Sequence, residues 1–349
     1  MKWTCLAVGA VWLLALGPGS PARADLRFGG FTDYSYFATD ADSGPSSGIR
    51  EGQFVLHLNS ALSDRLAFFG EITWSPSDHG FGTEIERSIL TYRHNDAFKP
   101  SVGRYHTPVS WWNVAFHHGA WLQTSVDRPI PVKFGSSFTP VHFVGAMVDG
   151  TVFPAGLNVS YTGGVGNGRG ENVARAGDAG DVNEHRATIV RLQLRPDALY
   201  SLQAGGALYL DRFPIEADGS ELDETMLSAF VVYTSETPEL LAEFFFIRHE
   251  DDVTGQTSES TSYYVQLGYR LPWRHGLCKP YGRVENMDIS DTDRGFMEAE
   301  SAVPDLRRYL AGIRLDVAAP VAVKLEGRRS REQNFDWVNE FFTSVSLVF

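Results

Sequence analysis

Histidine residues at the centre of the chain are the first candidates for a chemical site. His117 and His118 are adjacent, and neighbouring residues of an extended chain point to opposite faces, so such a pair rarely binds one metal ion. No cysteine or carboxylate lies nearby with metal-ligand spacing. We therefore interpret both as ordinary loop histidines and expect neither a metal site nor a cofactor.

Sequence motifs for catalysis are also missing. His57 lies close to Asn59 and Ser60 on one predicted strand, but nothing around them forms a nucleophile motif. The glycine-rich run 163–168 leads into a polar stretch rather than a helix, which is typical of a flexible loop. The sequence contains no CxxCH motif and so cannot carry c-type haem itself. We expect no enzymatic activity.

Charged side chains recur instead at alternating positions of otherwise apolar segments. In 306–317, Tyr309 and Ile313 share one face of an extended chain, and Arg308 and Arg314 share the other. If the polar faces line a pore, their excess of arginine and lysine favours anions. If the cations pair with neighbouring carboxylates, little net field remains. The residues predicted on polar faces are Arg93, Arg104, Arg191, Arg270, Arg283, Arg308, Arg314, Lys324 and Arg328, with Glu71, Glu243, Glu285, Asp316 and Glu326.

Alternation with a two-residue period predicts β-strands, and segments of about ten residues show it from residue 26 to the end of the chain. A membrane barrel turns the apolar face to lipid and a soluble sandwich turns it inward, so alternation alone does not separate them. The connections do, because short joints such as 63–65 and 95–97 alternate with longer polar stretches. Counting between them predicts about sixteen strands. The longer stretches are 38–48, 75–83, 107–138, 166–184, 211–223, 250–260, 288–304 and 331–336.

The two ends of the chain indicate export. A basic residue, an apolar run at 6–16 and small residues just before position 25 are typical of a cleaved signal peptide. The apolar run is too short to cross a bilayer as a helix. We expect removal of residues 1–24 and one barrel over residues 25–349. Phe349 ends an alternating strand, which resembles the C-terminal signal recognised by the barrel assembly machinery.

Composition narrows the partners. The chain has 43 acidic side chains against 30 Lys and Arg, which argues against nucleic acid as a partner. Acidic clusters fall in the longer connections, where divalent cations that bridge lipopolysaccharide would suit them, although solvation alone also explains them. Outside the signal peptide Cys278 has no second cysteine for a disulfide. The expected partners are outer-membrane lipid and lipopolysaccharide, the assembly machinery and small solutes.

A family resemblance rests on the stretch 98–108. It contains Gly103, Arg104 and Pro108, and this G-R-x-x-x-P pattern resembles the strand ending before the third outer loop of porins. Residues 25–349 are similar in plan to sixteen-stranded porins of the general and phosphate-selective O/P types. The resemblance implies that the third loop, 107–138, folds into the barrel and narrows it, and that the protein forms homotrimers.

The third loop departs from the family, because it is rich in aromatic residues and histidine rather than in acids or lysines. So much apolar surface would not remain exposed to water, and we expect the loop to pack against the inner wall. Contact of these aromatics with a neighbouring subunit or with lipopolysaccharide is an open alternative. The residues expected at the constriction are Trp111, Trp112, Phe116, His117, His118, Trp121, Asp127, Arg128 and Lys133.

These patterns predict an all-β, antiparallel transmembrane barrel of the bacterial outer membrane. We expect passive diffusion of small hydrophilic solutes through it, with a weak preference for anions. One alternative is a barrel that serves as a scaffold or sleeve for a partner such as a multihaem cytochrome. A second, less supported by the motifs, is an outer-membrane enzyme. A sleeve needs a lumen without an occluding loop, so the position of 107–138 discriminates between the first two functions.

Overall fold

The computed structural model describes most of the chain after its amino-terminal segment. The described residues are 25–42, 44–77, 80–116, 118–133, 138–170, 173, 180–181, 183–215, 219–297 and 303–349, without the side chains of 274 and 275. The predicted signal peptide, 1–24, and His117 lie outside the described residues.

Strands make up most of the structure. They are β1 (Asp25–Thr39), β2 (Ser47–Glu51), β3 (Phe54–Ala61), β4 (Leu66–Ser77), β5 (Gly80–Tyr92), β6 (Lys99–His106), β7 (His142–Val152), β8 (Leu157–Asn167), β9 (Ala187–Pro196), β10 (Leu202–Pro214), β11 (Glu221–Thr234), β12 (Glu239–Asp251), β13 (Thr257–Gly268), β14 (Cys278–Asp288), β15 (Leu306–Ala318), β16 (Val321–Glu332) and β17 (Val338–Val348). The helices are α2 (Trp111–Phe116), α3 (Arg294–Met297), η1 (Ile130–Val132), η2 (Asp197–Leu199) and η3 (Trp273–Gly276). In the described part of the chain no helix has the length and apolar character needed to cross a membrane.

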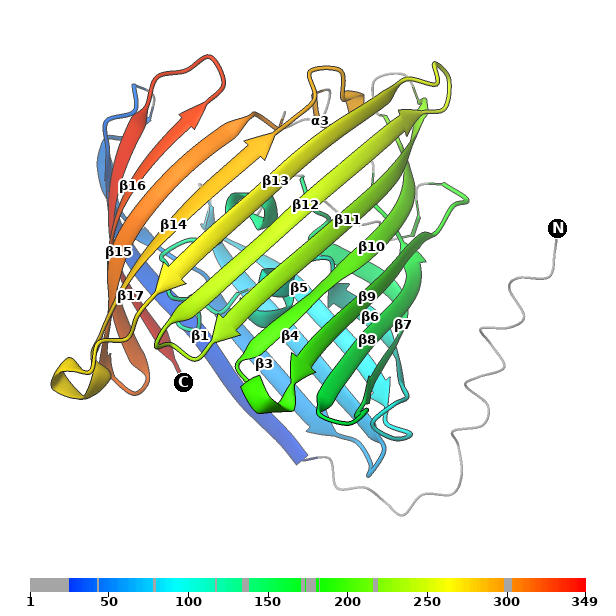
Figure 1. Cartoon of the computed structure of the whole chain (residues 1–349), viewed down its shortest axis with the longest axis horizontal. Coiled ribbons are helices and arrows are strands. Elements are labelled where there is room, and N and C mark those ends of the chain that lie inside the picture. The colour runs from blue at the N-terminus through cyan, green and yellow to red at the C-terminus, as the bar shows by residue number, and fades with distance from the viewer. Residues whose placement is uncertain are drawn as a thin grey trace.

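The strands form one closed barrel (Figure 1). Consecutive strands pair antiparallel, and β1 closes the barrel on β17. Both β2 and β3 pair with β1, and they are two parts of one strand interrupted at 52–53. The seventeen segments among the described residues therefore form sixteen barrel strands, which confirms the predicted fold class and strand count.

Side chains alternate across the wall as the sequence predicts. On β15, Tyr309 is 48% exposed and Ile313 is 40% exposed, whereas Arg308 and Arg314 are 5% and 6% exposed. Apolar side chains thus face outward and charged side chains face inward. This is the reverse of a soluble sandwich, and it suits a wall between lipid and a polar lumen.

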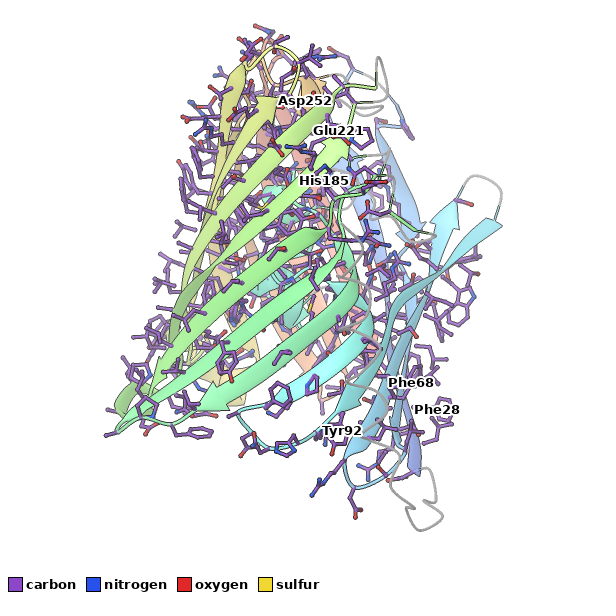
Figure 2. All side chains as sticks on the ribbon, turned by 90° about the vertical axis from the view of Figure 1, so that its right-hand side faces the viewer. Phe28, Phe68, Tyr92, His185, Glu221 and Asp252 are labelled. Atoms are coloured by element: carbon purple, nitrogen blue, oxygen red, sulfur yellow. The ribbon has the colours of Figure 1, made fainter. Side chains whose placement is uncertain are left out.

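The two ends of the barrel differ in the length of their connections. Figure 2 shows Phe28, Phe68 and Tyr92 toward the end where short turns join the strands. Glu221 and Asp252 lie at the opposite end, beside longer connections. Aromatic rings at one rim and polar groups at the other suit a barrel with distinct inner and outer membrane boundaries.

Some strands extend farther than the sequence predicts. The stretch 75–83, predicted as a long outer connection, is mostly strand, because β4 continues to Ser77 and pairs there with Gly80 of β5. This prediction was wrong for a physical reason. A hairpin that extends beyond the membrane has water on both faces, so polar residues do not mark where the strand ends.

Candidate functional site: the lumen and its inner loop

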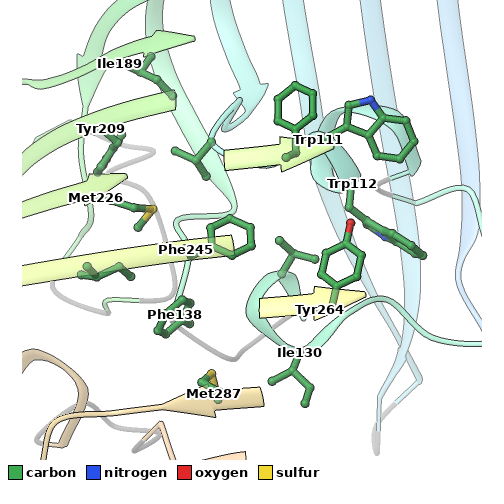
Figure 3. Close-up of a cluster of buried hydrophobic side chains, with 14 of the residues drawn as sticks. Trp111, Trp112, Ile130, Phe138, Ile189, Tyr209, Met226, Phe245, Tyr264 and Met287 are labelled. Carbon is green, nitrogen blue, oxygen red and sulfur yellow. The ribbon is translucent and has the colours of Figure 1, made fainter. Parts of the chain in front are cut away.

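We name the connection between β6 and β7, residues 107–141, the inner loop. It contains α2 and η1. Figure 3 shows Trp112 beside Tyr264 of the wall, and Phe138 near Phe245. The ring centroids of Trp112 and Tyr264 are 5.9 Å apart, and the Trp112 side chain is fully buried. Trp112 and Phe138 of the loop therefore pack against the wall instead of facing bulk water.

Glu243 on β12 binds the start of α2. Its carboxylate accepts hydrogen bonds from the backbone N–H groups of Trp111 at 2.6 Å and Trp112 at 2.9 Å, and from the Ser110 hydroxyl at 3.0 Å. The Tyr264 hydroxyl on β13 donates a fourth bond at 2.7 Å. The first N–H groups of a helix have no partner within it, so a buried wall carboxylate is a strong anchor for them.

Two residues of β14 bind the middle of the loop. The Arg283 guanidinium donates to the Ser125 hydroxyl at 2.8 Å and to the Asp127 carbonyl at 3.0 Å. Glu285 accepts a hydrogen bond from the N–H of Ile130 at 2.8 Å. Arg283 and Glu285 also pair with each other, so one ion pair of the wall serves two sections of the loop.

Two residues of β16 hold the same section from another direction. The Lys324 ammonium donates to the carbonyl oxygens of Ala120 at 2.5 Å and Ser125 at 2.9 Å. Arg328 pairs with the Asp127 carboxylate at 2.8 Å. Burial raises the pKa of Asp127, but the Arg328 guanidinium outweighs burial and lowers that pKa to about 2.

Two further wall side chains bind the loop between these anchors. Arg314 on β15 donates to the Gln123 carbonyl at 2.9 Å, and its guanidinium lies 5.6 Å from the ring centre of Trp121. Glu239, the first residue of β12, accepts a bond from the Thr124 hydroxyl at 2.9 Å. Contacts with β12, β13, β14, β15 and β16 together require that the loop lies inside the barrel.

The remaining constriction residues differ in burial. The Phe116 ring lies 4.9 Å from the ring of Trp112. Arg128 is buried and donates to the side-chain oxygen of Asn113 at 3.0 Å, which joins two sections of the loop. Lys133 is exposed. The loop is thus braced internally as well as against the wall.

Most of the inward charges are paired. Arg191, Arg308 and Lys324 differ, because they contact a glutamine, a serine and backbone carbonyls respectively. Among the described residues no carboxylate lies within ion-pair distance of these three. The paired wall residues include Arg283–Glu285, Arg314–Asp316 at 2.8 Å, Arg328–Glu326 at 2.7 Å and Arg87–Glu71 at 2.6 Å.

Three of the arginines predicted to line the pore lie near the ends of their strands. Arg93 follows Tyr92, the last residue of β5, and is exposed just beyond the strand, so its prediction was wrong. The alternation that defines faces ends where the strand ends. Arg270 follows β13 and forms its ion pairs at the rim with the short turns. Arg104 on β6 pairs with Glu84 at 2.8 Å.

A group of histidines and glutamates lies where the inner loop meets the wall near its own roots. His118 Nε2 is 3.1 Å from Glu86, and His142, the first residue of β7, is 2.5 Å from the same carboxylate. His106, the last residue of β6, is 3.3 Å from Glu71. We missed this group in the sequence because its members belong to separate strands. It also changes the interpretation of His118, which is buried and not an ordinary loop histidine.

Among the described residues, this group is the part of the lumen where potential metal ligands cluster. Glu71, His106 and His118 place three ligand atoms within 4.8 Å of one another, and Glu86, His106 and His142 do the same. The expectation of no metal site considered only neighbours in the sequence, and the fold brings together residues that are not neighbours.

Comparison with solved structures identifies proteins with the same fold. No protein-family model and no curated protein matches the sequence. The anion-selective porin of Comamonas acidovorans aligns with a TM-score of 0.68 and 11% identity, over 93% of this chain and 100% of that chain. Salmonella typhi OmpF in complex with daunomycin aligns at 0.62 and 11%, over 93% and 97%. The outer membrane channel DcaP of Acinetobacter baumannii aligns at 0.57 and 12%, over 95% and 99%. The chain therefore has the fold of outer-membrane porins, in agreement with the resemblance seen in its sequence.

Proposed function

We propose that this protein is a passive diffusion channel of the bacterial outer membrane for small hydrophilic solutes. The observation that carries the proposal is a closed barrel, apolar outside and charged inside, with a loop anchored within its lumen. A barrel of sixteen strands is wide enough for an aqueous passage beside a partial filling. Two proteins of the same fold are described as an anion-selective porin and an outer membrane channel, which supports the same function here.

The inner loop also bears on the alternative functions. A sleeve around a partner protein needs an unobstructed lumen, and hydrogen bonds from β12, β14 and β16 to the inner loop oppose that arrangement. Polar side chains of the lumen serve mainly to bind the loop and each other, which favours a channel over an enzyme. These contacts support diffusion through a pore narrowed by the inner loop as the main function.

The proposed selectivity is a weak preference for anions. Arg191, Arg308 and Lys324 have no carboxylate at ion-pair distance among the described residues, whereas the other inward cations are mostly paired. A small number of unopposed cations favours negative solutes only moderately. Exposed Lys133 on the inner loop adds one more positive charge.

The reversal potential across a planar bilayer under a potassium chloride gradient tests this function. We expect stepwise conductance and a reversal potential shifted toward that of chloride. Arg308→Gln should reduce the shift, and Arg307→Gln, on the exposed face of the same strand, is the matched control that should leave it unchanged. Insertion of the protein into the bilayer without any conductance would contradict the proposed channel function. Equal permeability to potassium and chloride would contradict only the anion preference.

Export and assembly are part of the proposal. Removal of residues 1–24 would leave Asp25 at the start of β1. Phe349 exchanges backbone hydrogen bonds with Gly30 of β1 at 3.1 and 2.9 Å, while its ring is 55% exposed, which suits a proposed assembly signal.

Mass spectrometry of the purified protein tests cleavage, and membrane insertion of Phe349→Ala tests the signal. Light scattering in detergent tests the predicted homotrimer.

A further inference from the structure

The His–Glu group consists of Glu71, Glu86, His106, His118 and His142. Its members come from β4, β5, β6, the inner loop and β7, in that order. They are 0%, 3%, 5%, 6% and 9% exposed. Three imidazoles and two carboxylates thus gather in one buried part of the lumen. Both of the three-residue sets with clustered ligand atoms include His106.

Two backbone irregularities lie beside this group. The register between β4 and β5 shifts next to Glu71, which leaves Glu86 as an extra residue of β5 with a buried side chain. Such bulges reorient side chains and are frequent next to functional sites. On β6, Gly103 has a φ of 147°, and a Cβ there would lie 1.9 Å from the Ser88 carbonyl oxygen. Only glycine permits that approach of β6 to β5.

We propose that Glu71, His106 and His118 form a site for a divalent transition-metal ion, with Zn²⁺ as the reference ion. Two imidazole nitrogens and a carboxylate oxygen, completed by water, are a donor set that Zn²⁺ uses. Bonds of about 2.0–2.1 Å place tetrahedral ligands about 3.3 Å apart. His106 Nε2 and Glu71 Oε2 already lie 3.3 Å apart, and all three ligand atoms lie within 4.8 Å.

Local charge favours this set over the other. In the set with Glu86 and His142, Arg104 lies 2.9 Å from Nδ1 of His142 and places a fixed positive charge directly on a ligand. In the proposed set Arg87 binds the carboxylate of Glu71 at 2.6 Å, so its positive charge is paired with the negative charge of that ligand. Glu86, 3.1 Å from His118, supplies a second negative charge that offsets this arginine.

A bound ion would have a structural consequence. Glu71 and His106 belong to the wall, and His118 belongs to the inner loop. The ion would therefore fasten the loop to β4 and β6, across the lumen from the anchors on β12 to β16. The proposed site is a metal clip for the loop, and its occupancy is independent of whether the barrel conducts.

Calorimetric titration of Zn²⁺ into residues 25–349, refolded in detergent and freed of metal with a chelator, tests the site. We expect one bound Zn²⁺ per chain. His106→Gln and His118→Gln should each weaken binding by about 100-fold or more, because changes outside the ligand set already cost 10–100-fold. His249→Gln is the matched control. That imidazole is equally buried and lies 2.8 Å from Glu224 and 2.7 Å from Asp293, outside either set of three clustered ligand atoms.

A second measurement on the unmodified chain does not depend on how the variants fold. Co²⁺ bound by two imidazoles and a carboxylate in a four-coordinate site gives strong visible absorption, which Zn²⁺ should then abolish. Circular dichroism verifies the strand content of each variant. The proposal is overturned if the chain binds no Zn²⁺, if His118→Gln binds it unchanged, or if His142→Gln alone abolishes binding, since the ion would then occupy the other set.

Discussion

The inner loop is held at two sides of the lumen by different chemistry. On the side of β12 to β16, charged side chains such as Glu243, Arg283 and Lys324 bind backbone groups of the loop. On the side of β4 to β7, the loop meets the wall through His118 and its glutamate and histidine neighbours. The carboxylate, guanidinium and ammonium groups of the first side bind the loop directly, whereas the imidazoles of the second side are also common ligands for metal ions. The first side therefore supports the loop through side chains of the wall alone, whereas a metal ion at the proposed site would add to the support on the second side.

Removing the carboxylate of Glu243 should weaken the contacts between the loop and the side of β12 to β16 most severely. Glu243→Ala leaves the N–H groups of Trp111 and Trp112 and the Ser110 hydroxyl buried without their acceptor. Each such group costs about 1–3 kcal/mol, so loss of the three bonds should lower the free energy of unfolding by about 3–9 kcal/mol. Chemical denaturation in detergent measures this fall, and hydrogen exchange at the two tryptophan amides measures release of the loop.

The isosteric variant is the control for this effect. Glu243→Gln retains one acceptor oxygen and the side-chain volume, so it should lose less than Glu243→Ala. Protection of the Trp111 and Trp112 amides that is unchanged in both variants would show that Glu243 does not hold the loop.

Lys324 should have an intermediate effect on both stability and selectivity. Lys324→Met removes two charged hydrogen bonds to loop carbonyls and one unopposed positive charge. We expect a loss of about 1–2 kcal/mol in unfolding free energy and a smaller chloride preference. Denaturation and reversal potential measure the two changes. Lys324→Arg keeps the positive charge and should keep the chloride preference. A loss of chloride preference in this variant would show that the charge at position 324 does not set the selectivity.

Arg191 should affect selectivity without loosening the loop. Among the described residues its side chain contacts Gln193 and the ring of Phe230, and not the inner loop. One unit charge at 4 Å in water contributes about 1 kcal/mol, so Arg191→Gln should lower the chloride-to-potassium permeability ratio by at most about fivefold. A ratio equal to that of the unmodified channel would remove Arg191 from the residues that set selectivity.

A change at the rim with the short turns should have the smallest effect on the free energy of unfolding. Asp316 pairs with Arg270 and Arg314 where the short turns lie, and its side chain is 26% exposed. Solvent screens such pairs, so Asp316→Asn should change the unfolding free energy by less than about 1 kcal/mol. A loss comparable to that of Glu243→Ala would show that the rim supports the barrel as strongly as the loop anchors do.

The sequence was sufficient to predict the wall. On β16, Lys324, Glu326 and Arg328 alternate without a register shift, so a period of two places all three on the inner face. The same rule failed at Arg93, because β5 ends one residue earlier. The G-R pattern at Gly103 resembles that of porins, and the close approach to Ser88 is the physical reason for its glycine.

The site within the lumen was harder to predict. His118 meets Glu86 because three strand registers and a bulge beside Glu71 combine, and none of these is visible in a local pattern. The role of Glu243 depends on where the loop crosses the lumen. The aromatic content predicted that the inner loop would pack against the wall, but not which wall residues it would contact.

The size of the passage beside the inner loop tests the central claim most directly. Single-channel conductance in the presence of neutral polymers of graded size reports the smallest polymer that is excluded. We predict that the unmodified channel conducts, and that it excludes polymers that Glu243→Ala admits once its loop is released. The same exclusion size in both channels would contradict the claim that the inner loop sets the width of the pore.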